Sequence, residues 1–168
     1  NLVLDDHSGQ IIVFEGLLAQ VDMQNLLSGC KLEQRPIRIY GKTILQPRLT
    51  AFFGDEGVTY TYSNTQLSAL DWTPEMHAIK SEIQDRLELK FNSALINYYR
   101  NGDDSMGWHA DNERELGLNP TIVSVNFGEK RKMKFKELSG QCRKIDLHLS
   151  HGDVLIMSGA LQHRWQHA

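Results

Sequence analysis

The sequence has few cysteines and no long apolar run. Two cysteines, Cys30 and Cys142, lie far apart among its 168 residues and stand in no metal-binding spacing. This favours two free thiols in a reducing cytoplasm over a disulfide or a zinc cluster. No apolar run approaches the roughly 18 residues that a membrane-spanning helix needs. We therefore expect a cytoplasmic protein without a membrane span.

The sequence also lacks an excess of positive charge. Eighteen Lys and Arg residues stand against 21 Asp and Glu residues, for a net charge of −3. A uniformly basic nucleic-acid binder is thereby excluded, and any phosphate contact requires a local patch. The candidate is the run Glu129–Lys136, where apolar and cationic residues alternate. Such a strand would have one cationic face, which suits a phosphate backbone or simply a solvated surface.

The first half of the chain carries mixed signals. Residues 15–28 give a weak helix pattern, whereas 37–40, 49–53 and 59–62 are rich in β-branched and aromatic residues and predict short strands. The clearest helix is predicted from Pro74 to Lys90, with Thr73 as its N-cap.

The second half is dominated by a period of two. Apolar residues alternate with polar ones at 122–127, 132–136 and 144–149, and a compact apolar strand follows at 153–157. Such alternation predicts antiparallel strands with one buried face. Helices followed by many short strands indicate an α+β chain whose catalytic half is a β-sandwich or barrel.

A short motif in this half suggests a metal site. His109 and Asp111 would point to the same side of a strand, because side chains alternate along it. A third ligand could come from His163 or His167, which share strand parity. Two imidazoles and one carboxylate leave part of the metal open, as non-haem iron(II) requires for a co-substrate and O₂.

Several motifs, in order and at maintained distances, resemble the AlkB family of Fe(II)- and 2-oxoglutarate-dependent dioxygenases. They span roughly residues 35–168 and comprise Asn97-x-Tyr99, His109-x-Asp111-x-Glu113, Ser124–Gly128, His151–Met157 and Trp165-Gln166-His167. The resemblance implies a double-stranded β-helix (jelly roll) with N-terminal helices and a nucleotide-recognition lid. We expect one dioxygenase domain over 1–168, with helices and lid in about 1–90 and the jelly-roll core in about 91–168.

The resemblance also implies ligands and cofactors. Fe(II) would be held by His109, Asp111 and His167, and Asn97 and Tyr99 would contact 2-oxoglutarate, which reacts with O₂. In relatives, an arginine on a strand beyond the distal histidine clamps the co-substrate. The printed sequence ends at Ala168, before that strand, and we expect the strand to follow it.

A substrate site follows from the same resemblance. Tyr62 would stack on the damaged base, Tyr60 would line the pocket, and Glu113 would contact the exocyclic amino group of the base. Tyr40 could act as a wedge in the base stack. Arg131, within the basic run, is a further candidate for a contact with the substrate. Each tyrosine could equally fill a sheet face, and Glu113 could be a solvated acid.

We therefore expect a monomeric enzyme that oxidatively demethylates 1-methyladenine and 3-methylcytosine in alkylated DNA, with RNA as the alternative substrate. We expect it to be nucleoid-associated if its source is bacterial. The alternatives are a nucleic-acid-binding module with a degenerate oxygenase site, a dioxygenase with another kind of substrate, and a jelly-roll protein with structural zinc.

Overall fold

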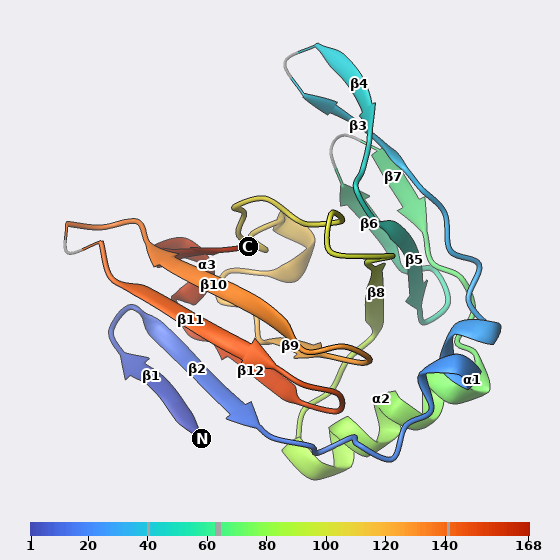
Figure 1. Ribbon diagram of the computed structural model, residues 1–168, viewed down its shortest axis with the longest axis horizontal. Helices are drawn as coiled ribbons and strands as arrows, with labels where there is room; N and C mark the ends of the chain where they lie inside the picture. Colours follow the sequence, from blue (N-terminus) through green and yellow to red (C-terminus); the bar gives the residue numbers. More distant parts are fainter. Residues whose placement is uncertain (40, 63–64, 141) are drawn as a thin grey trace. The chain divides into compact units, whose positions relative to one another are not determined.

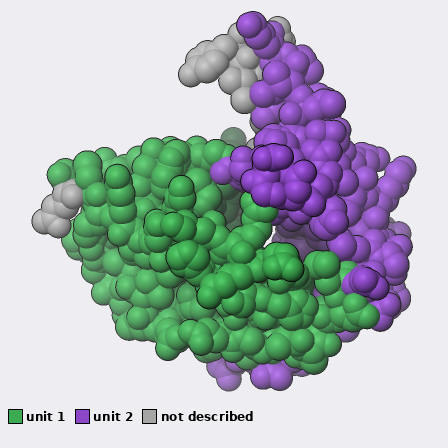
Figure 2. All heavy atoms as spheres, viewed as in Figure 1, with its two compact units in different colours: residues 1–23, 107–168 green, residues 24–106 purple. Residues whose placement is uncertain are grey.

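The computed structural model describes residues 1–39, 41–62, 65–140 and 142–168 and divides into two compact units. Unit 1 consists of Asn1–Met23 and Gly107–Ala168, and unit 2 of Gln24–Met106 (Figure 2). The expected boundary near residue 90 divides the chain differently, because the first residues belong with the second half. That the whole chain forms one domain stays a prediction.

Unit 1 contains a four-stranded antiparallel sheet in the order β1-β2-β12-β9 (Figure 1). Its strands are β1 (Leu2–Asp6), β2 (Gly9–Phe14), β12 (Val154–Ser158) and β9 (Ile122–Val125). The strand expected at 153–157 is central in this sheet and is almost wholly buried. A continuous apolar run fits a strand that is covered on both faces.

A second, three-stranded antiparallel sheet has the order β11-β10-β13. Its strands are β11 (Lys144–Leu149), β10 (Arg131–Glu137) and β13 (Trp165–His167). The alternation seen in the sequence is confirmed here. Met133 and Phe135 lie on the inner face with Ile145 and Leu147, whereas the lysines between them lie on the outer face.

The two sheets of unit 1 share one apolar core. Its buried members come from both sheets and from the short helix α3 (Leu161–Arg164) that precedes β13. Two antiparallel sheets packed through their inner faces form a sandwich. Together with the similarity reported below, this confirms a jelly-roll-like fold. The core residues are Leu4, Ile11, Val13, Phe135, Leu149, Leu155, Met157, Leu161 and Trp165.

The first 28 residues differ most from the sequence-based expectation. Residues 1–14 form the hairpin β1–β2, and β2 pairs along β12 from Gln10↔Ser158 to Phe14↔Val154. The helix expected at 15–28 is wrong for its first half, and α1 covers only Met23–Ser28. Tertiary hydrogen bonds hold the preceding turn, because Gly16 N donates to Asp153 Oδ1 and Leu18 N donates to the Gly152 carbonyl.

The described residues of unit 2 form three strand pairs and two helices. β3 (Pro36–Ile39) pairs with β4 (Lys42–Leu45), β6 (Thr59–Tyr62) with β7 (Thr65–Ser68), and β5 (Leu49–Gly54) with β8 (Ser93–Tyr98). Helix α2 runs over Pro74–Leu87, slightly shorter than predicted. Its N-cap is confirmed, since the Thr73 hydroxyl accepts from Met76 N.

Both cysteines are free thiols, as expected. None of the helices in the described part of the chain combines the length and the apolar character that a bilayer crossing requires.

Candidate metal centre

Three side chains of unit 1 meet as the sequence predicted. One ligand atom from each of His109, Asp111 and His167 lies within 4.8 Å of the other two. His109 Nε2 is 3.6 Å from Asp111 Oδ1, and His167 Nε2 is 3.5 Å from Asp111 Oδ2. Atoms bound at about 2.1 Å to one ion stand about 3 Å apart at right angles and about 4.2 Å apart across it. The two histidine–carboxylate distances, 3.6 and 3.5 Å, lie in that range.

The backbone brings these residues together across the second sheet. His109 and His167 form an antiparallel bridge and exchange both hydrogen bonds, at 3.0 and 2.8 Å. On its other side His167 pairs with Phe135 of β10. Within residues 108–111 the β pairing is limited to this single bridge at His109. The side chains of His109 and Asp111 nevertheless face one another.

The position of His109 sets which ring nitrogen is available. Its Nδ1 lies 2.9 Å from the Gly107 carbonyl, which can only accept a hydrogen bond. Nδ1 therefore carries the proton, and the lone pair of Nε2 points to Asp111. A hydrogen bond on one imidazole nitrogen that fixes the other toward a metal is a recurrent feature of metal sites.

Burial controls the charge of the other two groups. Burial and the charge of the neighbouring His109 lower the pKa of His167 to about 3, so this imidazole is neutral at physiological pH. Burial raises the pKa of the Asp111 carboxyl; His109 opposes that rise and Glu113 adds to it. A divalent ion bound between the three side chains would stabilise the charged form of this desolvated carboxylate.

One contributor was not foreseen from the sequence. Gln162, on α3, is buried, and its Oε1 accepts a hydrogen bond from Asp111 N at 2.9 Å. Its amide nitrogen lies 3.8 Å from Met157 Sδ. Gln162 therefore fixes the backbone that carries the carboxylate ligand. No sequence signal separates it from other glutamines.

The structure also separates the two histidines that competed for the third position. His163 lies on α3, is exposed, and its Nε2 contacts the Leu118 carbonyl. It is not part of the cluster formed by His109, Asp111 and His167. The geometry therefore agrees with His167 as the third ligand.

Two nitrogen donors and one carboxylate whose ligand atoms lie close together fit a ferrous ion with open coordination positions.

Comparison with known proteins also indicates an iron-dependent oxygenase. The sequence profile described as "2OG-Fe(II) oxygenase superfamily" matches residues 10–168. The chain belongs to this superfamily and, within it, to the AlkB family.

Named relatives support the family. The chain is 40% identical over 134 residues to the mouse "Alpha-ketoglutarate-dependent dioxygenase alkB homolog 3", covering 74% of this chain and 46% of the relative. It is 35% identical over 139 residues to the "DNA oxidative demethylase ALKBH2" of Bos taurus, covering 79% and 50%. The chain thus spans about half the length of the curated relatives it matches.

A solved structure supports the fold alone. The chain reported as "The structure of OsALKBH1" superposes with a TM-score of 0.68 at 16% identity, covering 99% of this chain and 86% of that one. At such low identity the similarity concerns the arrangement of strands.

In this AlkB-family chain the expected co-substrate residues lie in unit 2. Asn97 is in β8 and pairs with Thr50 of β5, while Tyr99 follows the end of the strand. The buried Asn97 Oδ1 has no hydrogen-bond partner within the described residues. With the amide rotated by half a turn, an N–H donor would occupy this position, as a bound carboxylate requires.

The expected substrate residues are scattered over both units. Tyr60 and Tyr62 belong to β6, and Tyr40 lies outside the described residues. Glu113 caps the 3₁₀ turn Arg114–Leu116, so the strand on which it was expected does not continue; its charge nevertheless raises the pKa of Asp111. Arg131 starts β10 on the inner face and is not on the face that carries the lysines. The substrate roles of these residues stay predictions.

Proposed function

We propose that the protein is an Fe(II)- and 2-oxoglutarate-dependent dioxygenase that demethylates N-alkylated bases, such as 1-methyladenine and 3-methylcytosine, in DNA. The observation that carries the proposal is the cluster of His109, Asp111 and His167, whose ligand atoms lie within 4.8 Å of one another. Membership of the superfamily and the printed name "DNA oxidative demethylase" of one relative support the reaction.

Iron(II) held by His109, Asp111 and His167 would supply the oxidation chemistry of the superfamily: one oxygen atom of O₂ would enter succinate as 2-oxoglutarate loses CO₂, and the other would convert N–CH₃ to N–CH₂OH. The hydroxymethyl group would then leave as formaldehyde and restore the N–H base. Asp111 contributes the carboxylate, and the imidazoles of His109 and His167 contribute nitrogen lone pairs. Phe135 provides an apolar neighbour for His167, since the centroids of the two rings lie 5.9 Å apart. Asn97 and Tyr99 would bind the co-substrate.

A nucleic acid is the substrate class that suits the outer face of the second sheet. Lys132, Lys134 and Lys136 alternate along β10, and Lys144 faces Lys136 across to β11. Lys132 pairs with Asp146, whereas no described carboxylate pairs with the other three. A row of unpaired cations attracts phosphodiesters even in a chain of net negative charge.

An exposed indole lies beside this cationic face. Trp108 precedes His109, is 42% exposed, and its ring centroid lies 4.6 Å from Lys136 Nζ. Aromatic side chains next to cations are the usual platform for unpaired bases. The same proposal includes a lid formed by Tyr60 and Tyr62 on the β6–β7 hairpin, a wedge role for Tyr40 and a base contact for Glu113. It also includes a monomeric state and a cytoplasmic location.

The test is demethylation of defined oligonucleotides. Single strands with one 1-methyladenine or one 3-methylcytosine are incubated aerobically with the protein, Fe(II) and 2-oxoglutarate and then analysed by mass. The proposal predicts loss of one CH₂ unit per methyl group, formaldehyde release, and dependence on all three additions. Asp111→Ala serves as the inactive control, since it removes the only charged ligand.

The alternatives give different outcomes. Binding of the oligonucleotide without mass loss, by a protein that retains no iron, would indicate a binding module. Succinate formation without base repair would point to another substrate, and tight zinc without oxygen consumption to a structural site.

A further inference from the structure

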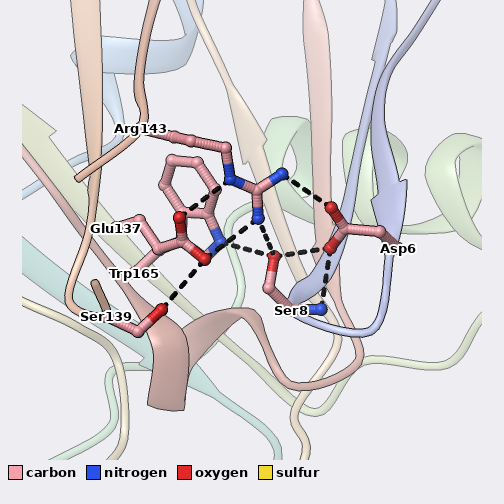
Figure 3. A network of polar contacts seen from close by, with 6 residues as sticks. All are labelled: Asp6, Ser8, Glu137, Ser139, Arg143 and Trp165. Atoms are coloured by element: carbon pink, nitrogen blue, oxygen red, sulfur yellow. Dashed lines mark hydrogen bonds and ion pairs between the residues drawn. The ribbon is translucent and has the colours of Figure 1, made fainter. Parts of the chain in front are cut away.

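A network of polar side chains joins the turn after β1 to the far end of β10 (Figure 3). Arg143 lies just before β11, and its guanidinium donates to Glu137 through Nε and Nη2, at 2.8 and 3.0 Å. Its Nη1 donates to Asp6 Oδ2 at 2.7 Å. One planar guanidinium thus connects two carboxylates from different sheets, with the paired geometry that lysine cannot reproduce.

Ser8 stands at the centre of this network. Its hydroxyl donates to Asp6 Oδ1 at 2.6 Å and accepts from Arg143 Nη2 at 3.0 Å and from Trp165 Nε1 at 2.9 Å. One donated and two accepted bonds fill the capacity of a hydroxyl. Ser8 and Trp165 are each only 1% exposed, so water cannot replace the hydrogen bond between them.

Trp165 connects the network to the metal centre. It pairs with Glu137 across β10 and lies two residues before His167, so both side chains point to the inner face. The Arg143 guanidinium also lies over the indole, 5.2 Å from its centroid. Trp165 is therefore held at its N–H, over its ring and through its backbone.

Such anchoring matters because β13 has only three residues. A slip of one residue in a strand moves every side chain to the opposite face. Here that slip would turn His167 toward the outer face and away from Asp111. The indole N–H bond to Ser8 exists only in the observed register.

We propose that Ser8 and Arg143 are positioning residues for the distal metal ligand: through Trp165 they fix the register of β13 and hence the place of His167. The inference rests on the proposed metal role of His167. It assigns a function to a cluster that contains none of the three candidate ligands.

The network is poorly suited to bind a ligand of its own. A pocket beside it is lined by His7, Glu137, Ser139, Gly140 and Arg143. Four N–H groups of the guanidinium, out of five, already donate within the protein. The polar groups of the network are therefore occupied by hydrogen bonds to one another.

The test is the affinity for Mn²⁺, measured anaerobically without nucleic acid at a temperature where every variant is folded by circular dichroism. Ser8→Ala and Arg143→Met should weaken binding about tenfold, at the lower end of the range for residues that support metal ligands. Arg143→Lys should restore part of the affinity. The visible spectrum of bound Co²⁺ should shift in the two disrupting variants, because His167 is displaced.

Two controls separate positioning from general stability. Ser139→Ala removes a hydrogen bond to Glu137 but none to Ser8 or Trp165, and should bind Mn²⁺ like the wild type. Val13→Ala destabilises the same core from β2 and should lower the melting temperature without changing the affinity. Equal affinity in Ser8→Ala, Arg143→Met and wild type would overturn the inference, as would an equal loss in Val13→Ala.

Failure of the proposed function gives a different pattern. A wild type that binds Mn²⁺ and shows the variant effects but repairs no base contradicts the demethylase proposal and leaves the positioning role supported. A wild type that demethylates, with metal affinity indifferent to Ser8 and Arg143, contradicts the positioning role alone. A wild type that binds no ion contradicts both.

Discussion

His109 and His167 are hydrogen-bonded partners across an antiparallel bridge, and their ring centroids lie 4.1 Å apart. Two histidines that are distant in sequence are thereby held by main-chain bonds, independently of any ion. Preorganisation of this kind reduces the ordering that metal binding would otherwise require. It also makes the contribution of each ligand separately testable.

The two terminal histidines should behave oppositely. His167→Ala removes a ligand and should weaken Mn²⁺ binding by more than about 100-fold, beyond the range seen for supporting residues. His163→Ala loses only a contact to the Leu118 carbonyl and should keep the affinity within about twofold of the wild type. Calorimetric titration of both variants measures this, and the reverse ranking would make His163 the ligand.

Gln162 should matter for both stability and metal binding. Gln162→Met keeps the volume but leaves Asp111 N without its acceptor, which costs about 1–3 kcal/mol for a buried donor. The loosened carboxylate should reduce the affinity for Mn²⁺ about tenfold. Gln166→Met, on the opposite face of β13, is the matched control and should leave the affinity unchanged. Loss of affinity in the control alone would refute the assignment.

The lysines of β10 should control the salt dependence of nucleic-acid binding. Lys134→Ala should reduce the slope of log K against log salt by about 0.7 for a single strand, because one phosphate contact is lost. Fluorescence anisotropy with an unmodified oligonucleotide over a range of salt concentrations gives the slope. Lys90→Ala, an exposed lysine of unit 2, is the control. Equal slopes for Lys134→Ala and wild type would exclude this face as the binding surface.

Acid should weaken the Arg143 network. Hydrogen bonds from Arg143 lower the pKa of Asp6 and of Glu137 below their ordinary values of 3.8 and 4.5. At pH values between the lowered and the ordinary pKa values, the folded state then binds fewer protons than the unfolded state. The stabilisation is complete above those ordinary values and is lost as the pH falls through the lowered ones.

Urea unfolding at about pH 5 and about pH 3 tests this. The wild type should lose more unfolding free energy between the two pH values than Arg143→Met, in which Asp6 and Glu137 lack the guanidinium that contributes most to lowering their pKa. An equal loss in both proteins would show that the network does not contribute to acid sensitivity.

The second half of the chain was predictable because its signals are local. Along β10 and β11 the alternation of apolar and charged residues fixes both the strands and their inner face. Thr73 and Pro74 mark the start of α2 for a similarly local reason. The candidate ligands, which the structure brings together, followed from the His109–Asp111 spacing and from the similarity to a known family.

The first residues were less predictable because distant partners decide their structure. Ile11 and Val13 alternate, but β2 joins the four-stranded sheet by pairing with β12, at the other end of the chain. Gly16 and Leu18 are held out of a helix by bonds to Asp153 and Gly152. The links from Ser8 and Gln162 to the metal centre likewise depend on tertiary contacts that residue spacing in the sequence does not predict.

The most direct test of the account is a crystal structure of the full chain loaded with Mn²⁺, with the ion located by its anomalous scattering. We predict one strong peak about 2.1 Å from His109 Nε2, His167 Nε2 and a carboxylate oxygen of Asp111. A crystal containing bound Mn²⁺ at any other set of side chains, or no peak between these three at saturating metal, would contradict it.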